Sequence, residues 1–403
     1  MRDTPPQNRV AKEIRTVMFL LIKNAELFSP SPVGMTDILI AGTRIVAIER
    51  GLPVPEGSGG AVLDAGGGPV IPGLIDAHVH IAGGGGEGGP ATRTPELQLS
   101  AMIIGGVTTV VGCLGTDGFT RSVESVLMKA KALRAEGVSA WIYTGAYQVP
   151  PPTITGEIGR DIALIEEVIG AGEIALSDHR SSVPSQQELI RIAEHARVGG
   201  MLGGKAGIVN VHLGDAADPF RPIHAAVEAS ELNYKQFLPT HCNRNRWIFE
   251  DAKEYGAHGW VDFTAASYPY FPDEEIKPSR AIRDLLTAGV PLSHITMTSD
   301  ANGSLPGFDS AGNLERLEMG SPSSVLREIR DAVLQDQLEL ETALAVATVN
   351  PAAVLKLPRK GAVAVGNDAD LVVLTNELEV ASVIANGAVM MQDGEVVRKG
   401  TYE

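Results

Sequence analysis

Eight apolar, strand-like runs alternate with helical stretches through the middle of the chain, and this alternation constrains the fold more than any other feature. Between the second and third runs, Val123, Val126 and Ala130 recur at helical spacing. Apolar runs that are each followed by a crossover are typical of a parallel sheet buried on both faces. Eight of them predict an α/β fold of the (β/α)8 TIM-barrel type. The runs cover residues 70–81, 107–114, 140–147, 174–177, 208–213, 237–240, 260–265 and 295–299, with further helical stretches at 184–197, 223–230, 279–288 and 323–357.

Both chain ends differ in sequence pattern from the middle of the chain. They consist of short β-type runs separated by turn residues such as those at 29–32 and 57–60. This pattern predicts a small β-sandwich domain built from both ends, into which the barrel is inserted. The expected domains are residues 1–70, 71–357 and 358–403, and the first dozen residues are expected to form a loose tail. The β-type runs lie at 17–23, 36–41, 45–48, 61–64, 368–374, 380–385 and 389–391.

Charge and composition exclude several classes of partner. The net charge is −16 and no run of Lys or Arg is present, which argues against nucleic acid and anionic membranes as partners. The longest apolar run near the N-terminus, at 17–22, is far shorter than the ~20 residues that a membrane helix needs. Two cysteines are too few for a disulfide framework, which favours the cytoplasm.

Histidines gather where the predicted strands end. His78 and His80 end the first strand, and His212, His241 and Asp300 end the fifth, sixth and eighth. Active sites of barrels lie at this end, and residues two apart on a strand share one face. One His-x-His pair could be ordinary hydrogen-bonded histidines, but the recurrence at other strand ends favours a metal site. Four histidines and an aspartate exceed the needs of one tetrahedral zinc and fit a pair of metals roughly 3.5–4 Å apart.

These residues resemble the amidohydrolase superfamily, which has the same pattern of ligands at the strand ends. Within it the chain is similar to the isoaspartyl dipeptidase family over about residues 17–403. The segments that carry the resemblance are IDAHVHIAGGGGEGGPATRTPE, VVGCLGTDG, TGAYQVP, SDHRS, THCNRN, TSDANGS and GNDADLVVL.

The resemblance implies a hydrolase that cleaves the β-aspartyl bond of isoaspartyl dipeptides by a hydroxide between two divalent metal ions, most simply Zn²⁺, and so clears products of damaged-protein degradation. His78, His80 and Asp300 would bind the first ion, and His212 and His241 the second. Asp300 would also transfer the proton from the nucleophile to the leaving amine, and Tyr147 would polarise the scissile carbonyl. A homo-oligomer is also implied.

Such a substrate carries one free ammonium and two carboxylates, so its site needs one anionic group and several cationic ones. Glu87, Arg180 and Arg244 provide that set just beyond predicted strand ends. Each could instead be a solvated residue, a salt-bridge partner or a helix cap. The resemblance adds three substrate contacts: Gly85, Thr116 and Ser304.

One position departs from the family pattern. A carboxylated lysine from the fourth strand usually bridges the two metals, whereas alignment on SDHRS places Glu173 there. Glutamate is also a monoanion with two oxygens, but it is shorter, so the backbone must lie nearer the metals. Gly170 and Gly172 would permit that approach. Lys205 as the bridge, or a single metal, remain the alternatives.

Other interpretations stay open. A related amidohydrolase, such as a hydantoinase, dihydroorotase or N-acyl-amino-acid deacylase, would share the scaffold, and a non-catalytic scaffold would be expected to have lost ligands. His179 is a candidate for orienting a neighbour at the site. Cys113 and Cys242 are expected to be buried thiols, and the remaining four histidines are expected to be surface or packing residues: His195, His224, His258 and His294. The native metal and the preferred leaving residue are not determined by the sequence.

Overall fold

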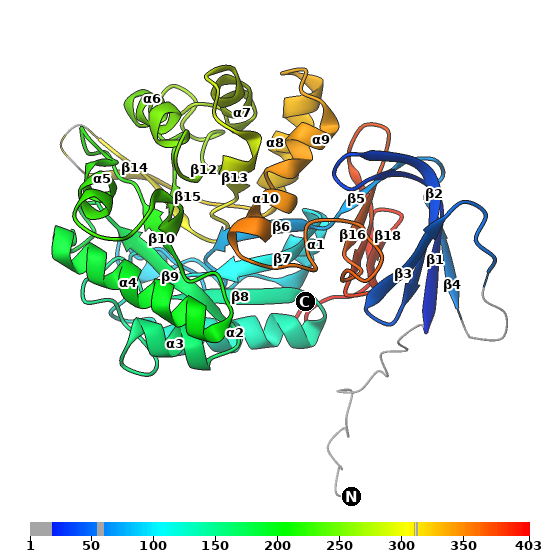
Figure 1. The fold of residues 1–403 in the computed structure, drawn as a ribbon, viewed down its shortest axis with the longest axis horizontal. Coiled ribbons are helices and arrows are strands. Elements are labelled where there is room, and N and C mark those ends of the chain that lie inside the picture. Colours follow the sequence, from blue (N-terminus) through cyan, green and yellow to red (C-terminus); the bar gives the residue numbers. More distant parts are fainter. Residues whose placement is uncertain (1–17, 55–59, 310, 312) are drawn as a thin grey trace, which may run out of the picture.

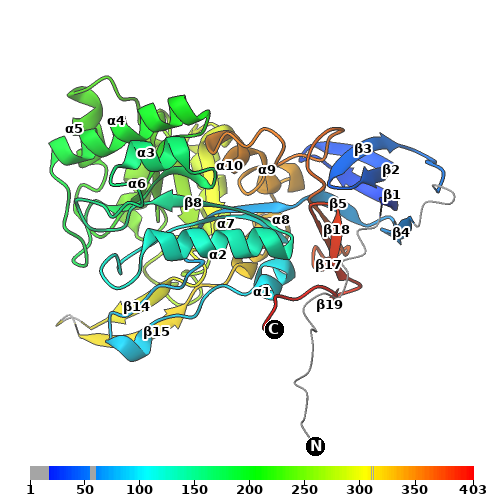
Figure 2. The same ribbon diagram turned by 90° about the horizontal axis from the view of Figure 1, so that it is seen from below.

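The computed structural model describes residues 18–54, 60–309, 311 and 313–403. The expected N-terminal tail and most of the expected 57–60 turn lie outside the described residues. The described chain has an α/β part that holds most of the helices and a smaller part made of strands (Figures 1 and 2). The α/β class predicted from the alternation of strands and helices is therefore confirmed.

Strands from both ends of the chain share one nine-stranded sheet, in which the blue and red strands of Figure 1 lie side by side. The central strand β5 pairs with β1 on one side and with β16 on the other. A separate hydrophobic cluster, which includes Leu27, Ile38 and Leu371, fills this part. The strands are β1 Phe19–Phe28, β2 Pro32–Ala41, β3 Arg44–Glu49, β4 Ala61–Asp64, β5 Pro69–Pro72, β16 Leu371–Leu374, β17 Val380–Ala385, β18 Ala388–Gln392 and β19 Glu395–Val396.

The first predicted central strand, 70–81, is wrong as a single element because the chain divides there. Residues up to Pro72 belong to β5 of the small sheet, and a new parallel strand, β6 (Leu74–Val79), begins after Gly73. A Cβ at Gly73 would lie 2.2 Å from Oγ1 of Thr108, and the Gly73 amide donates to the carbonyl of Asp370. Gly73 therefore allows the backbone to pass from one sheet directly into the other.

Six parallel strands, β6 to β11, form a curled sheet in chain order, and β12 pairs with β13. The two sheets approach at both edges: the Cys242 amide, just after β11, donates to the Asp262 carbonyl, and Val79 bridges Ala301 in parallel orientation. The strands after β6 are β7 Val107–Gly112, β8 Ser139–Thr144, β9 Val168–Ala175, β10 Ile208–His212, β11 Phe237–Thr240, β12 Val261–Thr264 and β13 Ile295–Thr298.

Helices follow most of these strands and pack around them, as the green and orange ribbons of Figure 1 show. Helix α4 begins with a capping box, in which Ser185 and Glu188 satisfy each other's backbone amides. The helices are α1 Leu99–Ile104, α2 Val123–Glu136, α3 Ile158–Leu164, α4 Gln186–Gly203, α5 Arg221–Glu228, α6 Arg246–Tyr255, α7 Pro278–Thr287, α8 Ser323–Leu334, α9 Leu340–Ala345 and α10 Val349–Val354, with 3₁₀ turns at Pro90–Thr92, Tyr234–Gln236 and Leu292–His294.

Glycines explain two boundaries that the sequence pattern places wrongly. The predicted helix 184–197 continues to Gly203, because Gly199 packs on the backbone of Gly159, where a Cβ would lie 2.7 Å from the carbonyl oxygen. The predicted strand 174–177 starts at Val168 instead. Its glycines interrupt the apolar run in the sequence, yet Gly170 is needed there because a Cβ would lie 2.6 Å from the Ile208 carbonyl oxygen of β10.

An antiparallel hairpin that sequence patterning does not reveal follows β13. Its strands are β14 (Ser304–Phe308) and β15 (Leu314–Met319), and it projects beside the parallel strands in Figure 2. The hairpin contributes Ser304, Leu305 and Pro306 to the main cavity described below. None of the helices in the described ranges has both the length and the apolar character required to span a bilayer.

Candidate metal centre and substrate cavity

A cavity of about 560 Å³ opens where the parallel strands end. Its wall combines residues from the ends of several strands with residues of the β14–β15 hairpin. Predicted site residues that line it are His80, Gly85, Thr116, Tyr147, Arg180, His212, His241, Arg244, Asp300 and Ser304. Polar groups from distant parts of the sequence thus meet at the strand ends, which is where barrel-type active sites lie.

His78 and His80 come from the end of β6 and are clamped to the segment after β13. The His80 amide donates to the Ala301 carbonyl, and the His78 carbonyl accepts from the Asp300 amide. The Nε2 atoms of the two histidines lie 3.6 and 3.0 Å from Oδ1 of Asp300. The structure therefore brings together the three side chains expected around the first ion.

Glu173 lies within β9 and faces all four expected histidines. Its Oε2 atom is 3.4 Å from Nε2 of His78 and 3.9 Å from Nε2 of His80. Its Oε1 atom is 2.8 Å from Nδ1 of His212 and 3.2 Å from Nε2 of His241. Each carboxylate oxygen thus faces a different pair of histidines.

The charge balance of this cluster favours an ionised Glu173. Burial opposes ionisation, but the His78 and His212 rings outweigh it and hold the pKa of the Glu173 carboxyl well below its usual range. Burial and the neighbouring His212 lower the pKa of His241 to about 4. An ionised carboxylate and a neutral imidazole are the forms that bind metals.

Several buried atoms of the cluster have no hydrogen-bond partner within the described part of the chain. They are Nδ1 and Nε2 of His78, Oε2 of Glu173 and Oδ1 of Asp300; the last three lie at ion-pair distance from neighbouring groups of the cluster but form no hydrogen bond there. Buried polar atoms are normally paired, because leaving one unpaired costs about 1–3 kcal/mol. A nitrogen and oxygen donor set of this kind fits divalent cations, so the residues present suit a metal centre.

Two histidines are oriented by partners on their far side. His241 has a positive φ of 64° after β11, and its Nδ1 lies 2.6 Å from Oγ1 of Thr264. The Nε2 atom of His212 lies 3.1 Å from Oδ2 of Asp178 on the far side, whereas the Tyr147 hydroxyl lies 2.6 Å from Nδ1, the atom that also faces Glu173. Such partners orient the ring of a ligating histidine and fix its tautomer.

Asp178 has a role at the site that the sequence interpretation did not assign to it. It accepts two side-chain hydrogen bonds from Arg180, with both donor–acceptor distances below 2.9 Å, and also contacts His212. Burial raises the pKa of Asp178, but Arg180 and His212 dominate and hold it well below its usual range. Asp178 therefore links the histidine and carboxylate cluster to the cavity, and its position two residues before Arg180 was the available signal.

Glu87 is held beside the cavity by two residues that line it. Its Oε1 accepts from Nη1 of Arg180 at 2.8 Å and from Oγ of Ser304 at 2.6 Å. Its Oε2 is buried and has no partner among the described residues. Glu87 itself is not part of the cavity lining, and it is linked to the cavity through its hydrogen bonds to Arg180 and Ser304, which line it.

Arg244 is placed on another wall of the same cavity. Its guanidinium donates to both oxygens of Asp215 at 3.0 and 3.2 Å, and Asn245 donates to the same carboxylate. The pKa of Arg244 is raised, because Asp215 outweighs the effect of burial. Two arginines, each oriented by its own aspartate, therefore face one cavity.

The alternative residues named from the sequence lie elsewhere. Nζ of Lys205 donates to the carbonyls of Ile162, Ile165 and Val168, at the opposite end of β9 from Ala175. Cys242 is buried and donates to the Pro239 carbonyl. The His179 side chain is 70% exposed, and it meets Asp178 only at 3.7 Å.

Glu275 is a cavity residue that the sequence interpretation did not single out, and it makes stability depend on pH. Burial raises the pKa of its carboxyl to about 8, although Ser267 donates a hydrogen bond to it. A pKa above the unfolded value of about 4.3 means that the folded state holds the proton more tightly. The stability contributed by Glu275 is therefore complete below pH ~4.3 and is lost as the pH rises towards about 8.

Glu275→Gln should flatten this part of the profile, because the amide cannot ionise. Urea unfolding of wild type and variant at pH about 5 and about 8.5 would measure the difference. The exposed Glu228→Gln on α5 is the control and should keep the wild-type dependence. An unchanged dependence in Glu275→Gln would show that this carboxyl ionises normally.

Comparisons with known proteins agree with this geometry. A sequence model of the amidohydrolase family matches residues 223–390. The crystal structure of a beta-aspartyl dipeptidase from Fervidobacterium islandicum AW-1, in complex with beta-Asp-Leu dipeptide, has a TM-score of 0.87 and 45% sequence identity. That match covers 94% of this chain and 98% of that one.

More distant matches share the scaffold. A D-hydantoinase from Thermus sp. has a TM-score of 0.70 at 18% identity, covering 94% of this chain and 97% of that one, which shows likeness of fold alone. A dihydroorotase from Geobacter sp. (strain M21) is 27% identical over 406 residues, which cover 89% of each sequence.

Proposed function

The chain belongs to the beta-aspartyl dipeptidase family of the amidohydrolase superfamily, and from this premise we propose a metal-dependent hydrolase that cleaves the isopeptide bond of beta-aspartyl dipeptides. The observation that carries the substrate assignment is Glu87, whose buried Oε2 lacks a partner among the described residues. The other oxygen of the same carboxyl group, Oε1, accepts hydrogen bonds from Arg180 and Ser304, which line the cavity. A dipeptide with a free ammonium would provide the missing partner of Oε2.

The metal centre is proposed to hold two Zn²⁺ ions per chain. His78, His80, Glu173 and Asp300 would hold the first, and Glu173, His212 and His241 the second, with Glu173 shared between them. When bound, the ions would act as Lewis acids and would lower the pKa of a water molecule so that it can attack near neutral pH.

The chain's own residues would handle protons and charge. Asp300 would take the proton from the attacking water and deliver it to the leaving amine. The Tyr147 hydroxyl would donate a hydrogen bond to the scissile carbonyl oxygen as negative charge develops there. Burial and the Glu173 charge raise the pKa of Tyr147 well above its usual value, so the hydroxyl keeps its proton for this purpose.

The substrate would be held by charge pairs at both ends. Glu87 would receive the ammonium, and Arg180 and Arg244 would bind the two carboxylates. Asp178 and Asp215 orient these guanidinium groups before substrate arrives, which lowers the entropic cost of binding. Three further contacts complete the proposed subsite: Gly85, Thr116 and Ser304.

A dihydroorotase, hydantoinase or N-acyl-amino-acid deacylase is the second candidate, because dihydroorotases are among the relatives at 27% identity. Their substrates are cyclic or N-acylated and carry no free ammonium. Glu87 would then have no charged partner in the complex. The charge set of the cavity therefore favours the dipeptidase.

The finer architecture is also a proposal. The eight strands β6 to β13 would close into a (β/α)8 barrel, since the β6 and β13 ends bridge through Val79 and Ala301. Residues 71–357 would form this barrel, and residues 1–70 and 358–403 a β-sandwich domain. We further propose a cytoplasmic homo-oligomer that clears isoaspartyl dipeptides left by degradation of damaged proteins.

The substrate assignment is tested by Glu87→Gln. The amide keeps the shape but loses the charge that attracts the ammonium, and a charge-assisted hydrogen bond is worth roughly 1.5–3 kcal/mol. We expect kcat/KM for beta-Asp-Leu to fall by about 10- to 200-fold with metal content unchanged.

Glu96→Gln provides the matched control on the same segment, because that side chain is 64% exposed and forms a surface ion pair with Lys129 at 3.4 Å. It should retain wild-type kinetics. Activity of Glu87→Gln within about twofold of wild type would show that Glu87 does not bind the ammonium. Turnover of dihydroorotate or an N-acyl amino acid in place of beta-Asp-Leu would transfer the assignment to the second candidate.

A further inference from the structure

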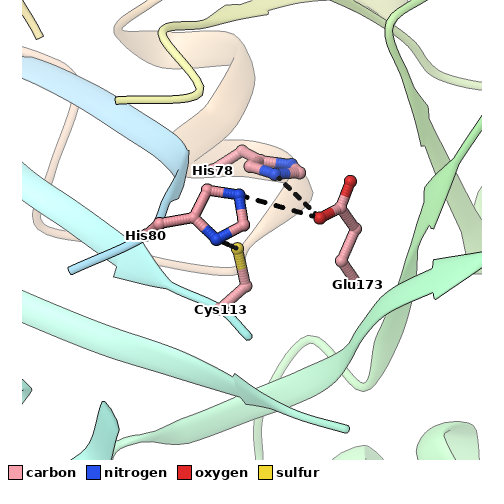
Figure 3. Close-up of side chains that lie close together, drawn as sticks. All are labelled: His78, His80, Cys113 and Glu173. Carbon is pink, nitrogen blue, oxygen red and sulfur yellow. Dashed lines mark hydrogen bonds and ion pairs between the residues drawn. The ribbon is translucent and has the colours of Figure 1, made fainter. Parts of the chain in front are cut away.

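Cys113 is part of the metal cluster, although neither the sequence interpretation nor the proposed ligand set includes it. It follows β7 and lies against His78 and His80 from β6 and Glu173 from β9 (Figure 3). Each of the four side chains offers one ligand atom, and these atoms all lie within 4.8 Å of one another. All four side chains are buried.

The contacts of the Cys113 thiol are weak. Its Sγ lies 3.7 Å from the Val79 carbonyl oxygen and 4.0 Å from Nδ1 of His80. Beside it, both ring nitrogens of His78 and Oε2 of Glu173 have no hydrogen-bond partner in the described ranges. His78 Nε2 and Glu173 Oε2 meet only as an ion pair at 3.4 Å, so several potential metal ligands with incomplete hydrogen bonding surround one point beside the thiol.

We propose that Cys113 binds the first metal ion as a thiolate, completing a four-ligand set with His78, His80 and Glu173. This inference rests on the metal centre proposed above. The thiol proton would pass to solvent as the ion binds, as it does when metals bind cysteine generally. Sulfur, imidazole and carboxylate ligands in this number match tetrahedral zinc.

With Cys113 as a ligand, the two proposed ions would have different numbers of protein ligands. Four protein ligands close the first site, whereas Glu173, His212 and His241 leave one position open at the second. Zinc sites with four protein ligands are typically structural, and those with three keep a position for water or substrate. The thiolate also makes the first site softer, which favours zinc over manganese or magnesium there.

If Cys113 is the fourth ligand of the first ion, Asp300 is not required as a ligand of that ion. It lines the cavity, and its Oδ1 contacts His80 at 3.0 Å from the cavity side. With the first site already closed, a bond from Asp300 to the ion is dispensable. Its carboxylate is then available to carry the proton.

Cobalt substitution tests the thiolate directly. The full-length protein is freed of metal and reconstituted with Co²⁺, and a thiolate ligand then gives a sulfur-to-cobalt charge-transfer band in the near ultraviolet. Cys113 and Cys242 are the only cysteines of the chain. Cys242 donates to the Pro239 carbonyl and is outside the cluster, so Cys242→Ser is the matched control.

We expect the band in wild type and in Cys242→Ser, and its loss in Cys113→Ser and Cys113→Ala. The Cys113 variants should also retain about one metal ion fewer per chain after dialysis. A wild type without the band, or a Cys113→Ser protein that keeps it, would overturn the inference. A Cys113 that only orients His80 by hydrogen bonding would give no band.

The design remains decisive if the Cys113 variants fail to fold. In that case the Cys242→Ser protein has Cys113 as its sole thiol, so a band there supports the inference and its absence overturns it. Dipeptide hydrolysis is not read in this experiment. A protein that shows the band but does not cleave beta-Asp-Leu would contradict the proposed function alone.

Discussion

Glu173→Ala should reduce the metal content from about two ions per chain to one or fewer and lower the activity by about 10³-fold or more. Each oxygen of Glu173 faces a different pair of histidines, so its removal would take a ligand from both proposed ions. The second set would retain only His212 and His241. Loss of the shared anion also leaves the repulsion between two dications less compensated in a buried site. Elemental analysis and beta-Asp-Leu hydrolysis measure the two effects.

Two further variants separate charge from burial. Glu173→Gln should also bind metal poorly, because the amide keeps the shape without the charge. Glu328→Gln removes a carboxylate of α8 that is as buried as Glu173, since both residues are 1% exposed, and this variant should keep its metal. When metal is added back to the metal-free wild-type enzyme, the recovered activity should not depend on bicarbonate, because no lysine carbamate has to form. Two ions retained in Glu173→Ala, together with activation by bicarbonate, would contradict the bridge.

Asp300→Asn should lower kcat by about 10²- to 10⁴-fold, because the amide cannot accept the proton of the attacking water or deliver it to the leaving amine. Asp300 lies after β13 with a φ of 56° and contacts His80, so it borders both the cluster and the cavity. The asparagine has nearly the same shape and should be accommodated. KM for the dipeptide should change little, since Asp300 is not assigned to its charged ends.

Metal content decides how the Asp300 result is interpreted. Full metal content with a low kcat would assign Asp300 to proton transfer, as expected if Cys113 closes the first site. Loss of an ion together with the activity would make Asp300 an indispensable ligand. A kcat within about tenfold of wild type would exclude it as the main proton carrier.

The main features of the fold could be predicted because buried apolar residues recur along the sequence at the regular spacing of helices and strands. The helical spacing of Val123, Val126 and Ala130 and the apolar runs of the parallel strands are visible without a structure. The predicted ends of helices and strands were wrong where a glycine allows two elements to pack closely against each other. Gly170 interrupts an apolar run in the sequence, yet it lets its strand approach Ile208, and only the neighbouring strand reveals this.

Local patterning also determines how much of the candidate site could be predicted. His78, His80 and His241 stand out because a histidine at the end of an apolar strand must find a polar partner in a largely apolar setting. Cys113 and Asp178 do not stand out. A buried cysteine is common, and an aspartate beside Arg180 has an obvious partner. Their proximity to the cluster depends on how separate strands meet, which is not a local property of the sequence.

The placement of β5 has a consequence for biosynthesis. Ile71 pairs with Val372, although the two residues are far apart along the chain. Until the ribosome has released β16, one edge of β5 has no partner, and β6, which carries His78, follows directly after it. Pairing over such a separation requires a costly loop closure and is formed late. The N-terminal strands are therefore synthesised well before their partner β16, and the small sheet can be completed only after β16 has left the ribosome.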